Sequence, residues 1–334
     1  MQFSEISRCK KCLISKTYPG IKLNDKNICN QCIQFDKKGE DQIIIKNNHE
    51  QIHAAILQTK GTGGIYDAIV AYSGGKDSTY TLKYLKQDYD LNILALLIDN
   101  DFIAERAFVN AKNVTRELGI DLMVFKPDAS FMHKLYRKSI HGNIYNKTQL
   151  KRANAACLSC INLINNIILN EAIIRNIPLI AGGYIGGQIP ATAGTLNTSG
   201  KLFEDFRKKN KNFLSVKIDP KVGNYLNIAE TDKSHYPIII NPMLGMNYSE
   251  DVIIRMISDL GWKKPKNTGL SSSNCQLNDY AISAHYDKYK YHSYEAEICL
   301  QVRRGTMTKD EAMKKLSDIK PLKSFSKIKN KLGV

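Results

Sequence analysis

The sequence predicts an α/β fold: a doubly wound parallel sheet, preceded by an N-terminal zinc ribbon and followed by a small C-terminal extension. Short apolar segments alternate with amphipathic ones through the middle of the chain, which is typical of parallel strands covered by helices on both faces. Four cysteines fall within the first 40 residues, and the chain after Trp262 is polar and rich in tyrosine and histidine. We therefore expect three parts, at residues 1–40, 41–260 and 261–334.

The central part is expected to begin with a helix over 50–58 and a glycine-rich joint over 61–64. Apolar runs of strand length then alternate with residues at helical spacing. The expected strands are 66–72, 91–98, 122–125, 178–181 and 237–240. The expected helices are 79–86, 104–118, 130–140 and 158–176, with one more over 309–316 in the tail. Residues 190–235, rich in Lys, Asn, Gly and Thr, are expected to form a long loop or insertion.

The composition is that of a globular chain with an excess of basic residues. With 334 residues, 43% of them hydrophobic, the chain is long enough to bury a sizeable core. The most hydrophobic segments have only the length of a strand, so no membrane-spanning segment is predicted. The first twelve residues are polar, so no signal peptide is predicted. A cytoplasmic location is the expectation. The net charge of +16 suits an anionic partner or solubility alone.

Between an expected strand and an expected helix lies the hexapeptide Ser73-Gly74-Gly75-Lys76-Asp77-Ser78. Glycines let the backbone turn tightly and approach a phosphate closely. The N-terminus of the following helix offers N–H groups and the positive end of its dipole to an anion. Lys76 adds a charge, and the hydroxyls of Ser73, Ser78 and Thr79 can donate hydrogen bonds. Because the Walker pattern GxxxxGK[ST] is absent, we predict a phosphate-binding loop of another kind.

Two further strand ends are expected at the same edge of the sheet. Asp99 ends the second strand, and Gly182-Gly183 closes the fourth. Open α/β sheets bind ligands at the carboxyl ends of their strands, so these residues are candidates for contact with the same ligand. Taken alone, Asp99 could equally cap the next helix.

The first four cysteines have the spacing of a tetrahedral zinc site. They form two CxxC pairs separated by sixteen residues, Cys9/Cys12 and Cys29/Cys32. Two such knuckles supply four thiolates, which leaves no open coordination position and indicates a structural ion. A segment of 40 residues needs such a structural ion, because it buries too little apolar surface to fold without one. A disulfide reading does not suit a cytoplasmic protein.

A third pair, Cys157 and Cys160, opens the helix expected before the fourth strand, and Cys275 lies in a later polar loop. A helix N-terminus lowers the pKa of a thiol, so thiolates are expected here. Two functional readings remain open: three cysteines ligating a [4Fe–4S] cluster with one free iron, or a persulfide/disulfide pair. The alternative is that these cysteines are small buried residues with no catalytic or metal-binding role. Cys299, in an alternating segment, is expected to be a core residue.

The hexapeptide matches the SGGxDS consensus of the PP-loop ATP pyrophosphatases at every defined position, and the chain resembles that superfamily. Its members cleave ATP between the α and β phosphates, transfer AMP to a substrate oxygen and release pyrophosphate. The resemblance implies an adenine nucleotide alpha-hydrolase-like sheet, with Asp99 near the adenosine and Gly182-Gly183 over the nucleotide. It also implies Mg²⁺ bound with ATP, and Lys76 and Asp77 as catalytic residues.

Two families within that superfamily are similar to this chain. The N-terminal cysteines, the hexapeptide and the tail from Arg304-Gly305 to Lys309-Asp310-Glu311-Ala312 resemble the N-acetyl sugar amidotransferases of surface-polysaccharide biosynthesis, from which the mid-chain CxxC is a departure. The zinc ribbon, the hexapeptide, the mid-chain CxxC and the later Cys275 resemble the PP-loop tRNA thiolases, in which three cysteines hold an iron–sulfur cluster. The 160-to-275 gap is long for that family, and a second, C-terminal zinc ribbon is missing.

Adenylation followed by thiolation is the first functional hypothesis, with catalytic Cys157, Cys160 and Cys275. Amidotransfer with ammonia from a glutaminase partner is the second. A zinc-ribbon RNA-binding protein with a vestigial ATP loop is the third. The acceptor is left open among a small molecule, a nucleotide-sugar and tRNA, and so is the sulfur donor. A homodimer is one option for the assembly, and no membrane partner is expected.

Overall fold

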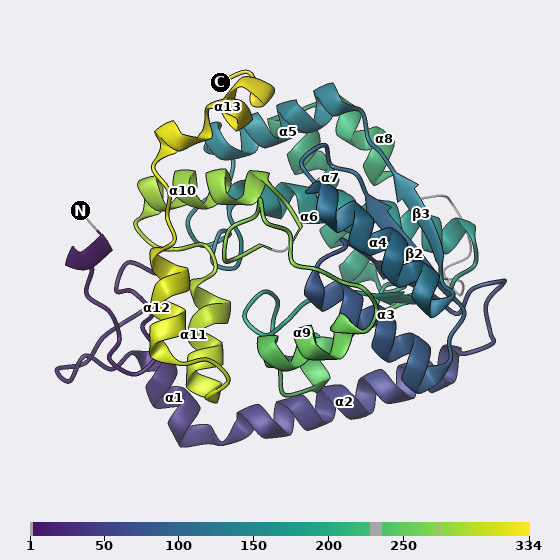
Figure 1. Cartoon of the computed structure of the whole chain (residues 1–334), viewed down its shortest axis with the longest axis horizontal. Helices are drawn as coiled ribbons and strands as arrows, with labels where there is room; N and C mark the ends of the chain where they lie inside the picture. The colour runs from purple at the N-terminus through teal and green to yellow at the C-terminus, as the bar shows by residue number, and fades with distance from the viewer. Residues whose placement is uncertain (1–2, 228–235, 273) are drawn as a thin grey trace.

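The computed structural model describes residues 3–227, 236–272 and 274–334, and shows helices packed around one central sheet (Figure 1). The sheet has six strands in the order β3-β2-β1-β4-β6-β5. Five of them are parallel, and β5 pairs with β6 in the antiparallel sense. The strands are β1 Ala68–Ala71, β2 Ile93–Ile98, β3 Asp121–Phe125, β4 Leu179–Ala181, β5 Thr195–Asn197 and β6 Ile238–Ile240.

The predicted doubly wound sheet is confirmed by the two cores on its opposite faces. Along β2, Leu94, Leu96 and Ile98 join one cluster, and the alternate residues join the other. This alternation follows from the two-residue period of a strand. The first cluster includes residues of α5 (Ala129–His141), α6 (Ala155–Ile174), α10 (Leu277–Tyr289) and α13 (Ser326–Leu332). The second includes residues of α2 (Glu40–Thr59), α3 (Lys76–Tyr89), α4 (Glu105–Leu118) and α9 (Glu250–Ser258).

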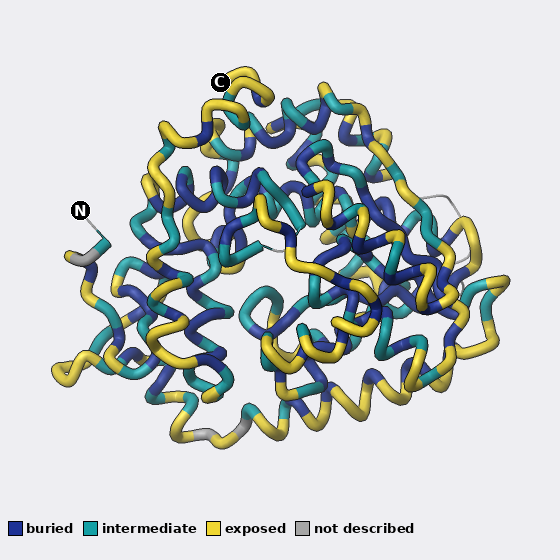
Figure 2. The backbone as a smooth tube through the Cα atoms, viewed as in Figure 1, coloured by how far each residue is buried: buried dark blue, intermediate teal, exposed yellow. Residues whose placement is uncertain are grey.

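Helix α6 is the one described helix long and apolar enough to cross a membrane by length and composition. The sequence analysis expected no such segment. Its buried residues include Leu163, Ile167 and Leu169, which pack into the core beneath the sheet. Helix α6 is therefore built as a core helix of this fold, in the interior that Figure 2 shows in dark blue.

The expectation of a long loop over 190–235 is wrong for its described part. That stretch contains β5, α7 (Lys201–Lys217), η2 (Pro220–Val222) and α8 (Gly223–Leu226), while residues 228–235 lie outside the described part. Leu214 of α7 and Val222 of η2 are buried in the core. Because α7 is rich in Lys and Asn and fully buries only Leu214, its apolar pattern is weak.

The C-terminal part is more helical than the sequence indicated. Besides the predicted helix, α12 (Lys309–Ser317), it forms α10, α11 (Glu295–Arg304), η5 (Leu322–Phe325) and α13. Helices α11 and α12 lie against the N-terminal cysteine segment (Figure 1), and Cys9, Ile14, Ile298 and Ala312 share one hydrophobic cluster. The remaining short elements are η1 Phe3–Glu5, α1 Asn30–Lys38 and η4 Pro242–Gly245.

Candidate functional site

The predicted phosphate loop joins β1 to α3, as expected from the strand–loop–helix pattern. Gly74 has a φ of 68°, and a Cβ there would lie 2.1 Å from the carbonyl oxygen of Ala107, so no other residue fits without a shift. The indole Nε1 of Trp262 donates to the Gly74 carbonyl at 3.0 Å, and Asn110 Nδ2 donates to it at 3.4 Å. These contacts fix the loop between the sheet and the segment that follows α9.

The hydroxyl groups of the loop form a compact network around the start of α3. Ser73 and Ser78 are linked Oγ to Oγ at 3.0 Å, and Thr79 Oγ1 donates to the Gly75 carbonyl at 2.8 Å. Gly75 is the N-cap, and no side chain caps the helix. The positive end of the α3 dipole is therefore available to an anion.

A second glycine loop closes over the first. Gly183, just after β4, lies so near α3 that an added Cβ would meet the Ser78 nitrogen at 2.8 Å and its Cα at 2.9 Å. Because β1 and β4 are neighbours and the chain winds in opposite directions from them, their carboxyl ends form the topological switch point of the sheet. The structure thus brings Gly183 to the predicted loop, whereas Gly182 lies against Asn241 and Tyr184.

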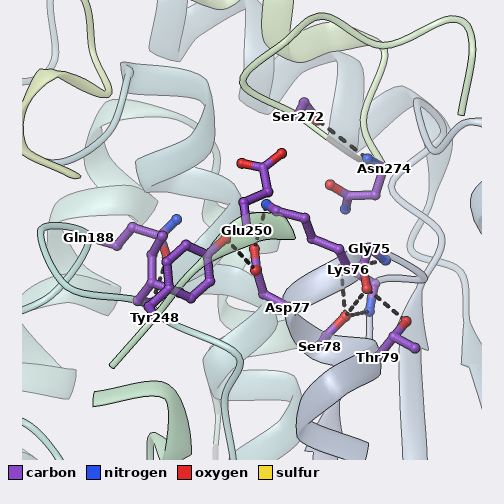
Figure 3. A network of polar contacts seen from close by, with 12 residues as sticks. Gly75, Lys76, Asp77, Ser78, Thr79, Gln188, Tyr248, Glu250, Ser272 and Asn274 are labelled. Carbon is purple, nitrogen blue, oxygen red and sulfur yellow. Dashed lines mark hydrogen bonds and ion pairs between the residues drawn. The ribbon is translucent and has the colours of Figure 1, made fainter. Parts of the chain in front are cut away.

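Lys76 and Asp77 point toward side chains from the C-terminal half of the domain (Figure 3). Lys76 Nζ lies 3.0 Å from Asp77 Oδ2, and the Tyr248 hydroxyl donates to Asp77 Oδ1 at 3.0 Å. Burial opposes the charge on Lys76, but Asp77, Tyr248 and Glu250 outweigh burial and hold its pKa well above the usual value. Lys76 is therefore positively charged at neutral pH.

Glu250 is the acidic partner of a second lysine in the same place. Its carboxylate pairs with Lys315 Nζ at 2.5 Å. Burial would raise the pKa of Glu250, but Lys76 and Lys315 outweigh burial and lower the pKa. A pocket opens here, and its lining includes Lys76, Tyr248, Glu250, Trp262, Glu297 and Lys315.

Asp99 lies at the carboxyl end of β2, as expected, and its side chain organises the turn there. Its Oδ1 accepts the Asp101 N–H at 3.0 Å, and its Oδ2 pairs with Lys126 at 3.0 Å. The alternative that Asp99 caps the next helix is wrong, because the N-cap of α4 is Ala104. A role of Asp99 in nucleotide binding stays a prediction.

Of the three cysteines expected at this edge of the sheet, Cys160 and Cys275 meet beside the next residue, Asn100. Its Nδ2 lies 3.8 Å from Cys160 Sγ and 3.9 Å from Cys275 Sγ. Cys275 reaches this place because its backbone bridges to Ile103, in the loop after β2. On the same side, Cys157 Sγ lies 3.3 Å from Asn278 Oδ1. The group forms at the carboxyl edge of the sheet, near the end of β2.

The expectation that the start of α6 favours thiolates is wrong. Burial, and then the nearby Cys160 sulfur, raise the pKa of Cys157 to about 11. Burial also raises the pKa of Cys160, and burial with the two other sulfurs raises that of Cys275 to about 12. For Cys157, desolvation outweighs the hydrogen bonds with Tyr294 and Asn154, which lower its pKa. Without a cation, these groups are neutral thiols at neutral pH.

The N-terminal cysteines form a closed tetrahedral set, as their spacing predicts. The sulfurs of Cys9, Cys12, Cys29 and Cys32 all lie within 4.8 Å of one another and are fully buried. Cys9 and Cys32 are 3.8 Å apart and Cys12 and Cys29 are 3.7 Å apart, as expected for bonds of ~2.3 Å to one central ion. Backbone N–H groups donate to two sulfurs, from Cys29 to Cys9 at 3.2 Å and from Cys32 to Cys29 at 3.3 Å. This donor set fits a metal ion.

Two C-terminal residues complete the surroundings of this set. Arg303 donates to Cys12 Sγ at 3.2 Å. The pKa of Cys12 is lowered by hydrogen bonds from neighbouring thiols, first Cys29 and then Cys299, and by the Arg303 charge. Cys299 is fully buried, as expected for a core residue, and belongs to the cluster around the cysteines.

The tail motif of the sequence has a structural explanation. Arg304 forms a bidentate ion pair with Asp41 at 2.8 and 2.7 Å. Gly305 ends α11 with a φ of 73°. Thr308 and Glu311 form a capping box at the start of α12. Ala312 is fully buried. Arg304 thus joins the tail to α2, and Ala312 packs in the same hydrophobic cluster as the N-terminal cysteines.

The sequence analysis missed several residues that the structure brings to the site. Tyr248 and Glu250 follow β6, and their position after a predicted strand at the same sheet edge is a signal that could have found them. Glu297 lies on α11, a helix that the sequence did not indicate, so no such signal existed for it.

No family model matches the chain. The chain is 28% identical to the uncharacterized protein MJ1599 of Methanocaldococcus jannaschii, over 92% of each chain. Among solved structures, the U34-tRNA thiolase NcsA of Methanococcus maripaludis with its [4Fe–4S] cluster has a TM-score of 0.36 at 16% identity, covering 90% of this chain and 86% of that one. The NMN synthetase of Francisella tularensis has a TM-score of 0.36 at 12% identity, covering 78% and 93%. Both are PP-loop ATP pyrophosphatase superfamily proteins.

Proposed function

We propose that this chain is a PP-loop ATP pyrophosphatase that adenylates an oxygen atom of an acceptor and then replaces that oxygen with sulfur. ATP use is supported by the glycine-bounded loop at the switch point, where Lys76 is held as a cation. The observation that carries the choice of sulfur is the meeting of Cys275 and Cys160 on one amide, Asn100 Nδ2, although 115 residues separate them in sequence.

In the proposed first step, the loop binds the phosphates of ATP, which arrives with Mg²⁺. The oxygen of an amide-type acceptor attacks the α phosphorus, the bond to the β phosphate breaks, and pyrophosphate leaves. The acceptor loses its N–H proton, so the product is an O-adenylated imidate whose nitrogen is uncharged. Lys76 and the N-terminus of α3 stabilise the charge that develops on the phosphates.

In the proposed second step, a sulfide nucleophile adds to the activated carbon, and AMP leaves with the original oxygen. The Cys160 side chain is buried, and Cys157 and Cys275 are half-buried. These sulfurs and two polar groups beside Cys160, Asn100 Nδ2 and the Tyr136 hydroxyl at 3.1 Å, fit an iron–sulfur cluster. Such a cluster, held by Cys157, Cys160 and Cys275, would supply an open iron for sulfide. The cation charge would also stabilise the thiolates that burial disfavours.

Amidotransfer is the second candidate, and the raised pKa values of the three thiols favour it. A neutral thiol is a poor nucleophile and a poor metal ligand. In this mechanism, ammonia from a glutaminase partner displaces AMP from an adenylated N-acetyl sugar. The cysteines then have no part in the chemistry, and their substitution leaves turnover intact.

The test combines visible absorbance of the purified protein with release of pyrophosphate. Protein purified without oxygen is expected to absorb in the visible region, and to release pyrophosphate from ATP in the presence of an unthiolated tRNA transcript or a UDP-N-acetylhexosamine. Lys76→Ala should slow release by about 100- to 1000-fold, since it removes one stabilising charge. An exposed control, Lys112→Ala on α4, should not change the rate. Turnover without colour favours amidotransfer, and no ATP cleavage with any acceptor contradicts the proposal.

We also propose that the N-terminal four-cysteine set holds one structural zinc ion. Its four mutually close sulfurs leave no place for a substrate. Metal analysis of the purified protein should find one zinc per chain, and an iron content confined to these four residues would contradict the assignment.

A further inference from the structure

Glu297 is a carboxyl group that takes no part in the two proposed steps. It lies on α11, more than 200 residues after the phosphate loop, yet it lines the same pocket as Lys76, Tyr248 and Glu250. Its Oε2 is buried and has no hydrogen-bond partner among the residues that the structure describes. A buried oxygen without a partner is costly, which points to a ligand group or proton that meets it.

The backbone places Glu297 in fixed relation to the phosphate loop. Gly187 has a φ of 93°, and a Cβ there would lie 2.4 Å from Glu297 Cα. The same loop carries Gly183, which contacts Ser78 at the start of α3. One short segment after β4 therefore touches both the phosphate loop and the backbone of Glu297.

The two glutamates of the pocket have opposite electrostatic surroundings. Lys76 and Lys315 lower the pKa of Glu250, so this residue is ionised at neutral pH. Burial raises the pKa of Glu297 to about 7, with Gln188 and Lys76 opposing the rise. The charged groups facing it are Lys76 and Asp77 from α3, Glu250 from α9 and Lys315 from α12, with Lys264 also in the pocket wall. Paired carboxyls of this kind often divide acid–base roles between them.

We propose that Glu297 is the general base that accepts the acceptor's N–H proton as its amide oxygen attacks the α phosphorus of ATP. This inference rests on the proposed function. The proton passes from the acceptor nitrogen to Glu297 Oε2, the N–H electron pair forms the C=N bond, and the former carbonyl oxygen forms the bond to phosphorus as pyrophosphate leaves. Glu250 stays ionised and holds Lys315.

The first test measures pyrophosphate release across pH 5.5–8.5 with the acceptor that the wild type uses. Glu297→Gln should lower kcat by about 100- to 10,000-fold, the usual effect of losing a general base. The wild-type kcat/KM should fall about tenfold per pH unit below pH 7, because protonated Glu297 cannot accept a proton. That dependence should vanish in Glu297→Gln and persist, at a lower rate, in Glu297→Asp. Glu117→Gln, an exposed change on α4, is the matched control.

The second test needs no acceptor. A non-hydrolysable ATP analogue with Mg²⁺ is titrated by calorimetry at pH 7 in two buffers of different ionisation enthalpy. A bound polyphosphate beside Glu297 raises the pKa of the carboxyl group further, so the wild type should take up protons on binding. Glu297→Gln should bind the analogue and take up fewer.

The outcomes separate this inference from the proposed function. A wild type that releases no pyrophosphate with any acceptor contradicts the proposed function, and the base role with it. An active wild type whose rate and pH profile are unchanged in a folded Glu297→Gln contradicts the base role alone. Loss of analogue binding in Glu297→Gln, or equal proton uptake by both proteins, also overturns it, because Glu297 would then be a binding residue or lie away from the phosphates.

Discussion

The two cysteine groups of this chain are built in opposite ways. The N-terminal four come from one segment of 24 residues, and their sulfurs lie as close together as one central ion requires. The group at Asn100 is assembled from a helix start and a distant loop, with an amide and a tyrosine hydroxyl beside its sulfurs. A complete set of four sulfurs suits a structural ion, whereas three sulfurs leave a coordination position for chemistry. CxxC pairs that look alike in sequence thus have different expected roles in the two groups.

The largest expected effect follows from disrupting the N-terminal four-cysteine set. Removal of the metal, or Cys29→Ser, should expose residues 1–40 to proteolysis, because a structural zinc contributes on the order of 10 kcal/mol to folding in small zinc peptides. Binding of the ATP analogue by the α/β part should persist. Limited proteolysis with mass spectrometry measures the first effect, and calorimetry the second. Equal protease resistance with and without metal would contradict the contrast between the two groups.

An intermediate effect is expected at the three-cysteine group. Cys275→Ser should lower formation of the thiolated product at least about 100-fold while pyrophosphate release continues, because the substitution acts after adenylation. Cys299→Ser, which changes a buried cysteine outside this group, serves as the control and should retain product formation per folded molecule. Parallel loss of pyrophosphate release in Cys275→Ser would show that the two steps are not separate.

The smallest effects are expected at the groups that flank the sulfurs. Tyr136→Phe removes the hydroxyl 3.1 Å from Cys160 Sγ and should lower product formation by about 10- to 100-fold, with zinc content unchanged. Arg303→Met removes the donor to Cys12 and should weaken zinc retention by a similar factor, with adenylation unchanged. Chelator competition and product assays on both variants measure these effects. A variant that changes both readouts would contradict the independence of the two groups.

Local patterns predicted the part of the fold that local physics determines. The strands of the parallel sheet, the loop of Gly74 and the four-cysteine set each depend on residues that are near one another in sequence. The helices of the tail were predicted poorly. Helix α10 is buried on several sides, and its buried residues include Tyr, His and Asn, so its sequence lacks the single apolar stripe that indicates an amphipathic helix.

The electrostatics of the site could not be predicted from local patterns either. The start of α6 predicted a lowered thiol pKa, yet the burial that raises the pKa of Cys157 comes from the folded surroundings. The pKa values of Glu250 and Glu297 differ for the same reason. The sequence around each residue shows only a glutamate in a polar segment, while the two lysines that lower the pKa of Glu250 come from α3 and α12. Such shifts depend on tertiary neighbours.

The contact between the two ends of the chain has a consequence for biosynthesis. Ile14 and Tyr18 of the cysteine segment share their hydrophobic cluster with Ile298 and Leu316, so an earlier-made segment completes its core with a much later one. Figure 1 shows the two segments side by side. At translation rates of ~5–20 residues per second, the interval between these segments is roughly 15 to 60 seconds. During that time, four cysteines leave the ribosome without the helices that cover them, and early metal binding would protect them from oxidation until α11 and α12 arrive.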